Sequence, residues 1–404
     1  MAHINVLLGT YEREVPQSMV LGTTMDRDAR VVGLDIGETS TMALLARQEG
    51  GKSYTAGVLI ESFSNAIPGI TKLAVPGFAC VIHYSRSPDY RPEWTTLVEP
   101  NTDEAAVASL RQLGGEPVGA KDVILVTPPQ LVEERRREYP DLDVYPLTFG
   151  SSELTVSSYL NLMGDESSSS LEQQVLLQLM SEMRSDLSPA RLLERIADHE
   201  WLTQEQKYLL NLKVSLAAGY IADDAHFASL VKSGRTMILD LRDEFLDRNT
   251  AFRLALCAFQ CMERITTTED GRRLPKLMVF DEAHQYANDP FLVSAMVEAV
   301  RLMRHKGMSL IFASQDPESL DPKILELCSI MLVLPLESPQ SVKTIVRYKG
   351  QLGNVPADSF MELKSGEAYI WSRKASDPIF SHTPIRVKIR PRATLHGGNT
   401  KKVE

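Results

Sequence analysis

The chain has 404 residues, of which 43% are hydrophobic and 24% charged, an ordinary globular composition for one large or two moderate domains. Its net charge of −10 argues against a surface that coats nucleic acid, so any grip on DNA must be local, as in a ring whose narrow pore alone is basic. No apolar run approaches the roughly 20 residues of a membrane span, the N-terminus lacks a signal pattern, and four cysteines fit a reducing compartment. These features predict a cytoplasmic protein without a membrane partner.

The first part of the chain, residues 1–38, contains short β-like pieces separated by glycines and a polar turn. It is too short for a full barrel, so we expect a short N-terminal β segment. Residues 39–385 then alternate apolar strands with helical patterns. This alternation predicts an α/β core with a mostly parallel sheet and helices on both faces, in which ligands bind at the carboxyl ends of the strands.

The core opens with a phosphate-binding pattern. An apolar strand at Leu44–Ala46 is followed by a glycine turn, the triplet Gly-Lys-Ser, and a helix expected from Tyr54. Such a loop wraps a β-phosphate with backbone N–H groups at a helix N-terminus. The lysine of the triplet would reach the β- and γ-phosphates of ATP, and the serine hydroxyl would bind Mg²⁺. The residues expected to bind nucleotide are Gly50, Gly51, Lys52, Ser53 and Tyr54.

The loop departs from the usual pattern at two positions. Ala46 stands where the first glycine of the motif is expected, a position that requires a small residue more than a positive φ. Glu49 places a carboxylate in a loop that cradles a polyanion, which weakens binding unless the side chain points outward or meets a cation such as Arg47. Gly-Gly-Lys-Ser as a mere loop cap is the alternative interpretation.

A largely helical segment interrupts the core. The polar run at 163–170 resembles a linker that doubles as a helix N-cap, and apolar residues at helical spacing continue to about Lys232. We predict a helical insertion over about 165–232, and a separate small domain is the alternative. Beyond the core, residues 386–404 form a basic, extended tail that we expect to be disordered from His396 onward.

A second phosphate-related motif follows the insertion. The buried apolar strand at 277–280 ends in two carboxylates, Asp281 and Glu282. In this arrangement Asp281 supports the metal shell and Glu282 orients and deprotonates the attacking water. The strand at 309–313 also ends in polar residues, Ser314 and Gln315. Together with the phosphate-binding loop, these strand ends predict an ATP- and Mg²⁺-dependent hydrolase.

Two other superfamilies share single motifs with the chain. Asp281 to His284 spells the DEAH box of RNA helicases, but about 230 residues separate it from Lys52, far more than in those enzymes, and their later arginine motif is missing. The segment from Gly33 to Ser40 resembles the first phosphate turn of the actin and sugar-kinase superfamily, with Asp35 on Mg²⁺. A second such turn is missing, and the alternative role of Asp35 is a polar strand end.

A third resemblance covers about residues 30–390. The carboxylate strand at 277–286, the stretch Arg304 to Pro317, and the strand Gly366 to Ile370 resemble the HerA/FtsK branch of RecA-like motor ATPases, in the HerA-like sense. The resemblance implies that Gln315 senses the γ-phosphate. It also implies that Arg304 enters the neighbouring subunit's site, with Arg301 and Arg373 as weaker alternatives, and that the protein forms a homo-oligomer, a hexameric ring, with DNA through its pore.

The resemblance implies an ATP-driven DNA translocase. No nuclease signature occurs in the sequence, so a separate nuclease or effector protein is the expected partner, in DNA end processing or anti-phage defence. The alternatives are a nucleotide-binding oligomeric scaffold, weakened by Glu49, and a conjugation or secretion ATPase of the same superfamily. Lys349 and the run Arg135–Arg137 are candidate DNA contacts, although the run, flanked by glutamates, reads more readily as a solvated helix face.

Overall fold

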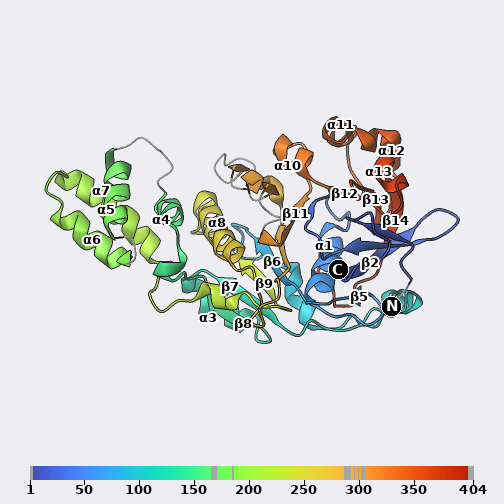
Figure 1. Ribbon diagram of the computed structural model, residues 1–404, viewed down its shortest axis with the longest axis horizontal. Helices are drawn as coiled ribbons and strands as arrows, with labels where there is room; N and C mark the ends of the chain where they lie inside the picture. The colour runs from blue at the N-terminus through green and yellow to red at the C-terminus, as the bar shows by residue number, and fades with distance from the viewer. Residues whose placement is uncertain are drawn as a thin grey trace.

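The computed structural model describes residues 3–164, 171–183, 186–285, 293–294, 296–298, 300–301 and 306–398. Across these residues a 14-stranded sheet runs through the molecule in the order β1-β3-β2-β14-β13-β12-β4-β11-β10-β6-β9-β7-β8, with β5 paired to β2 (Figure 1). The predicted α/β architecture with a mostly parallel sheet is confirmed.

The parallel block of this sheet carries the phosphate-related motifs. All neighbours from β12 to β8 in the sheet order run parallel. Most of their residues are buried, as expected for strands covered on both faces. The strands are β4 (Thr41–Leu45), β6 (Phe78–His83), β7 (Val123–Thr127), β8 (Asp143–Pro146), β9 (Thr236–Asp240), β10 (Lys276–Phe280), β11 (Met308–Ser314) and β12 (Ile330–Val333).

Strand β4 shows how the two faces are covered. Leu44 packs into the cluster that contains Ala56 of helix α1, whereas Leu45 packs into the cluster that contains Phe252 of helix α8. Successive side chains of a strand point to opposite faces, so the apolar run of β4 joins both layers. The helix that follows the phosphate-binding loop is thereby fixed against the sheet.

Helices cover both faces and form a lobe at one end. Those of eight or more residues are α1 (Lys52–Ser64), α2 (Glu104–Gln112), α5 (Leu171–Met183), α6 (Pro189–Asp198), α7 (Gln204–Ala218), α8 (Arg248–Arg264) and α11 (Pro339–Tyr348). Shorter ones are α3 (Val132–Glu138), α4 (Val156–Leu162), α10 (Pro322–Leu327), α12 (Ala357–Met361) and α13 (Ile379–His382). The 3₁₀ turns are η1 (Glu93–Val98), η2 (Pro129–Leu131), η3 (Ser151–Glu153), η5 (Phe227–Leu230), η6 (Ala283–Gln285) and η7 (Gly350–Asn354). None of the described helices is long and apolar enough to cross a bilayer.

The lobe lies where the helical insertion is predicted. Helices α5, α6 and α7 stand apart from the sheet, at the left of Figure 1. Ser188 caps α6, and Thr203 and Gln206 form a reciprocal capping box at the start of α7. Residues 165–170 and 184–185 of this region lie outside the described residues.

The other end of the sheet, antiparallel except for the parallel pair β1 and β3, joins both chain ends to the core. It consists of β1 (Val6–Leu8), β2 (Ser18–Thr24), β3 (Val31–Asp35), β5 (Thr71–Lys72), β13 (Glu367–Ser372) and β14 (Ile385–Ile389). Strand β14 pairs with β13 on one side and with β2 on the other. The N-terminal β segment therefore extends the core sheet.

The expectation of a separate basic tail from residue 386 is wrong for the described part. Residues 386–389 belong to β14, and Arg390 and Arg392 are buried after it. Two of the basic residues that suggested a separate tail pair with carboxylates of the core, Arg386 with Glu367 and Arg390 with Glu61. His396, where we expected disorder to begin, packs against Tyr54. Residues 399–404 lie outside the described residues.

Candidate nucleotide-binding site

The phosphate-binding loop connects β4 to α1 through a left-handed glycine. Gly51 has φ +92° and is the N-cap of α1, and no side chain caps the helix start. The first-turn N–H groups of α1 are therefore available to an anion. The helix begins at Lys52, two residues before the predicted start. A Cβ at Gly50 would lie 2.9 Å from the Arg47 carbonyl oxygen, so this turn requires glycine.

The structure accommodates both departures from the loop pattern. Ala46 is fully buried and its φ is not positive, so a methyl group fits where the motif usually has glycine. Glu49 adopts φ +60° and is exposed. No ion pair joins Glu49 to Arg47 among the described residues. The carboxylate of Glu49 is therefore solvated rather than neutralised.

Lys52 forms the centre of the site. Its Nζ lies 2.7 Å from Asp281 Oδ1 and 2.8 Å from Glu282 Oε1, and all three residues are at most 6% exposed. Burial alone would lower the pKa of Lys52, but the two carboxylates outweigh it and raise that pKa. Burial would likewise raise the pKa of Asp281, yet Lys52 and then His83 hold it well below its usual range. The lysine and Asp281 are both charged.

The strand order explains why Lys52 lies close to Asp281 and Glu282. Asp281 follows β10, Gln315 follows β11, and the phosphate-binding loop follows β4, with β11 in the middle. The three strands are parallel, so their carboxyl ends share one edge of the sheet. Strands β4 and β10 lie two strands apart, roughly 10 Å, a gap that an extended lysine side chain spans.

Glu282 is held in an unusual conformation. Its φ of +49° is in the left-handed region, which is rare for a residue with a side chain. Gln315 Nε2 donates to Glu282 Oε1 at 2.6 Å. Glu282 Oε2 accepts no hydrogen bond in the described part of the chain, although His284 Nδ1 lies 3.4 Å away. One buried carboxylate oxygen thus remains available to a further donor.

Sequence reasoning missed two residues next to Asp281. His83 ends β6, where its Nδ1 lies 3.4 Å from Asp281 Oδ2 and its Nε2 lies 2.9 Å from the Tyr90 carbonyl oxygen. Glu93 accepts a hydrogen bond from Ser53, and burial and Asp281 raise its pKa. The position of His83 at the carboxyl end of a buried strand was a usable signal. Glu93 follows an irregular loop and had no such signal.

A cavity of about 610 Å³ adjoins these residues. Its lining includes most residues of the phosphate-binding loop, the side chains of Tyr90, Glu93 and Gln315, and residues of the C-terminal segment. The cavity is large enough for a small ligand such as a nucleotide.

Comparison with known proteins gives a partial sequence match and fold matches over most of the chain. Over 146 residues, 35% of the chain, the sequence is 26% identical to the DNA double-strand break repair helicase HerA of Sulfolobus acidocaldarius, and the match spans 30% of that protein. The fold matches VirB4 of Thermoanaerobacter pseudethanolicus at a TM-score of 0.56 and 15% identity, covering 92% of this chain and 96% of that one. The plasmid coupling protein TrwB, in complex with ADP and Mg²⁺, matches at 0.53 and 10% identity, covering 96% and 93%. No protein-family model matches.

The chain therefore has the fold of the P-loop proteins VirB4 and TrwB, and about a third of it is similar in sequence to HerA. In this fold the segment that resembles an actin-type phosphate turn lies away from the phosphate-binding loop. Asp35 ends β3, and its Oδ1 accepts from the backbone nitrogens of Gly37 and Glu38, which closes a turn. That turn precedes β4, whereas the phosphate-binding loop follows it, so the two motifs lie at opposite ends of this strand.

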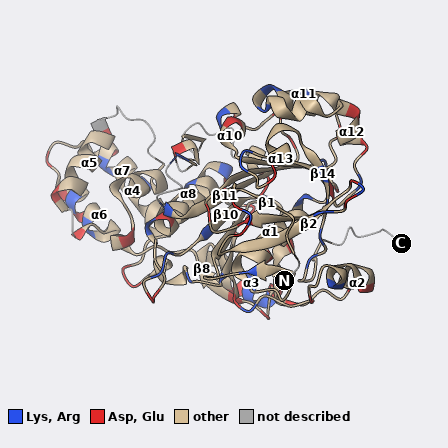
Figure 2. Ribbon diagram, turned by 45° about the vertical axis from the view of Figure 1, so that its right-hand side comes forward, with Lys and Arg blue, Asp and Glu red and all other residues tan. Residues whose placement is uncertain are grey.

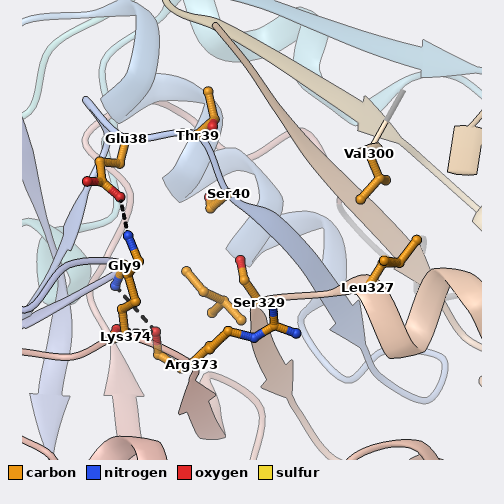
Figure 3. A pocket seen from close by; sticks show the side chains of 11 residues that line it. Gly9, Glu38, Thr39, Ser40, Val300, Leu327, Ser329, Arg373 and Lys374 are labelled. Carbon is orange, nitrogen blue, oxygen red and sulfur yellow. Dashed lines mark hydrogen bonds and ion pairs between the residues drawn. The ribbon is translucent and has the colours of Figure 1, made fainter. Parts of the chain in front are cut away.

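A second cavity, of about 150 Å³, lies at that opposite end (Figure 3). Glu38 is paired there with Lys374 at 2.8 Å. Arg373, one of the weaker alternatives for the arginine that enters a neighbouring site, also lines this cavity and is exposed. The preferred candidate, Arg304, lies outside the described residues.

The candidate DNA contacts of the chain are partly buried. Lys349 is 5% exposed and donates to the Glu326 carbonyl oxygen, so it caps the end of α10 instead of reaching solvent. Arg135 is 1% exposed and pairs with Asp240 at 3.0 Å, so the expectation of a solvated face fails at this residue. Acidic positions flank the basic ones on α3 (Figure 2).

The residues of the site fit a magnesium–nucleotide complex. Lys52 supplies a buried cation beside free helix N–H groups, and the Ser53 hydroxyl and the Asp281 carboxylate are the hard oxygen ligands that Mg²⁺ prefers. No group of three or more His, Cys, Asp or Glu residues able to hold a metal ion occurs in the described ranges. In nucleotide sites Mg²⁺ is usually held by one or two protein oxygens together with phosphate oxygens and water.

Proposed function

We propose that the chain hydrolyses Mg-ATP and uses the energy to move DNA through a hexameric ring, in partnership with a separate nuclease or effector protein. The observation that carries the proposal is the contact of Lys52 with both Asp281 and Glu282, with Gln315 on the same glutamate. The three side chains meet at one edge of the sheet, which supports the proposed roles of Lys52 as the phosphate-binding cation, Asp281 as the metal ligand and Glu282 as the general base.

The lysine contact suggests how nucleotide binding prepares the reaction. Triphosphate oxygens compete with the two carboxylates for Lys52, and its transfer to the phosphates frees Glu282. Glu282 then accepts the proton of the attacking water, and Gln315 orients the glutamate and senses the γ-phosphate. A bound Mg²⁺ would neutralise charge on the phosphate oxygens, with Ser53 and Asp281 as its protein ligands.

In this proposal a second subunit completes each site. Arg304, with Arg301 and Arg373 as the alternatives, supplies a guanidinium that stabilises the charge developing in phosphoryl transfer. Such an arginine typically changes the rate by about 10³-fold or more. The hexamer and the DNA path rest on the HerA-like resemblance of the sequence.

The first experiment is ATP hydrolysis by the purified protein, with and without linear double-stranded DNA, together with its mass in solution. DNA-stimulated turnover by a six-fold assembly is expected. A ring without turnover favours the scaffold, with Glu49 as its cause. A monomer without turnover contradicts both the motor and the scaffold.

A conjugation or secretion ATPase is the second candidate, supported by the fold match to VirB4 and TrwB over more than nine-tenths of the chain. The two candidates differ in partner. Tagged protein recovered with an activity that cuts linear DNA supports the nuclease pairing. Recovery in the membrane fraction without such an activity supports the conjugation-type candidate.

A further inference from the structure

The C-terminal strap, residues 390–398, is fixed to helix α1 by a buried carboxylate. Glu61 of α1 is fully buried and accepts hydrogen bonds from Arg390 Nη1 at 2.7 Å, Ala393 N at 2.9 Å, and Thr394 N and Oγ1 at 2.9 and 2.6 Å. Arg390 also donates to Ser62 and to the carbonyl oxygens of neighbouring residues. Every polar group of this contact has a partner, so the strap has one defined path over α1.

Arg392 directs that path toward the nucleotide cavity. Its guanidinium lies over Gly57, where an added Cβ would approach within 2.8 Å of Cζ. Its backbone nitrogen donates to the Tyr54 hydroxyl at 2.8 Å, and its Nη1 lies 3.2 Å from His396 Nδ1. The strap therefore positions two rings that line the cavity, those of Tyr54 and His396.

The two rings are arranged edge to face. Their centroids lie 5.1 Å apart with an interplanar angle of 76°. Arginine can only donate, so Nδ1 of His396 accepts and the imidazole proton resides on Nε2. Burial, followed by Arg392, lowers the pKa of His396 to about 4, which keeps the ring neutral at pH 7. Gly398 passes beside it, and a Cβ there would lie 2.8 Å from Nε2 and 2.9 Å from Glu93 Oε2.

We propose that His396 and Tyr54 bind the nucleobase of the nucleotide, so that the C-terminal strap forms the base-binding wall of the site. The inference rests on the proposed function. In the proposed function the loop and Lys52 bind the phosphates, and the aromatic pair lines the same cavity together with Pro391 and Gly398. A neutral imidazole presents an apolar face that stacks on a purine, as aromatic side chains do in other nucleobase sites.

The test compares Mg-ATP with Mg-tripolyphosphate, which has the phosphates but no base, by isothermal titration calorimetry. The matched variants are His396→Phe, which keeps a ring, and His396→Leu, which keeps apolar bulk without one. Both variants lack the Nδ1 acceptor, so a difference in affinity between them reports the contribution of ring stacking. We expect Leu to weaken ATP binding about tenfold relative to Phe. Tripolyphosphate affinity should be equal in both.

Equal ATP affinity of the two variants overturns the base-binding assignment, and so does a parallel loss of tripolyphosphate in His396→Leu. The control variant Lys52→Ala distinguishes a failure of the base-binding assignment from a failure of the proposed function. If wild type binds neither ligand, or Lys52→Ala leaves both affinities unchanged, the phosphate site itself is refuted. Wild-type binding of tripolyphosphate as tight as that of ATP refutes the base-binding wall alone.

Discussion

Glu282 combines three features that a general base for water requires. It is buried, its Oε1 is oriented by Gln315, and its Oε2 has no hydrogen-bond donor within the described residues. Its left-handed backbone, stabilised by the contacts of the side chain, aims the carboxylate at Lys52. These observations make the glutamate the residue whose amide variant is most informative.

We predict that Glu282→Gln lowers kcat at least about 100-fold, because removing a general base typically costs 10²–10⁴ in rate. ATP binding should persist, since Lys52 and the loop are unchanged. Turnover is measured by phosphate release and binding by calorimetry. Glu205→Gln, an exposed glutamate of α7, is the matched control. Normal turnover in Glu282→Gln rules out its role as base.

Variants of Glu49 distinguish the DNA-translocating motor from the nucleotide-binding scaffold as the function of the chain. Its side chain is exposed and its φ is +60°. Glu49→Gly should stabilise the fold by about 1 kcal/mol, because glycine adopts the left-handed conformation without strain. Glu49→Gln removes the charge but keeps the strain, so thermal unfolding and ATP affinity of the pair distinguish the two effects. Substantial wild-type turnover that Glu49→Gly leaves unchanged rejects the scaffold.

His396 should make stability depend on pH. Its pKa falls from 6.5 in the unfolded chain to about 4 in the fold, where Arg392 is the cation beside it and Glu93 the nearby acid. Between these values the unfolded chain binds the proton and the folded chain does not, so stability is present above pH 6.5 and decreases as the pH falls toward 4. Relative to His396→Phe, the melting temperature of wild type should drop in this window. A constant difference contradicts the assignment.

At the scale of elements, the sheet order and the strap define the site. Strand β11 lies between the strands of the phosphate-binding loop and of Asp281, which gives Gln315 its place against Glu282. Strand β14 leads directly into the strap, which packs on α1. Residues of the strap therefore line the same cavity as the first residues of α1.

Removing the Glu61 carboxylate that anchors the strap should lower the free energy of unfolding. Glu61→Ala leaves the fully buried Arg390 without its carboxylate, and breaking a buried pair in this way typically costs about 3–5 kcal/mol. The measurement is urea unfolding of both proteins. Glu116→Ala is the control, because the Arg111–Glu116 pair is more than half exposed and should contribute less than about 1 kcal/mol. Equal losses would show that the strap is not anchored by Glu61.

At the scale of the whole molecule, the proposal requires each site to be completed by a neighbour. Arg304→Ala should abolish hydrolysis and leave nucleotide binding intact. Mixed rings of Arg304→Ala and Lys52→Ala subunits should regain part of the activity, because an intact loop from one subunit then meets an intact arginine from the other. ATP turnover across mixing ratios is the measurement. Absence of any rescue indicates an arginine that acts within its own subunit.

The sequence by itself determined the fold class and the motif residues around Lys52, Asp281, Glu282 and Gln315. These features are local: a strand, a glycine turn and a helix start are encoded by adjacent residues, and polar residues that end apolar strands mark the carboxyl edge of a parallel sheet. The local sequence patterns were therefore sufficient to predict the fold class and these motif residues.

Tertiary structure alone decided the roles of His83, Glu93, Glu61 and His396. Each depends on a contact between residues far apart in sequence, such as Glu61 with Arg390, 329 positions apart. The basic character of the C-terminal segment suggested a separate, extended tail, because the composition of a segment gives its charge but not the buried partner that stabilises it. A buried carboxylate on α1 turned that segment into a wall of the site.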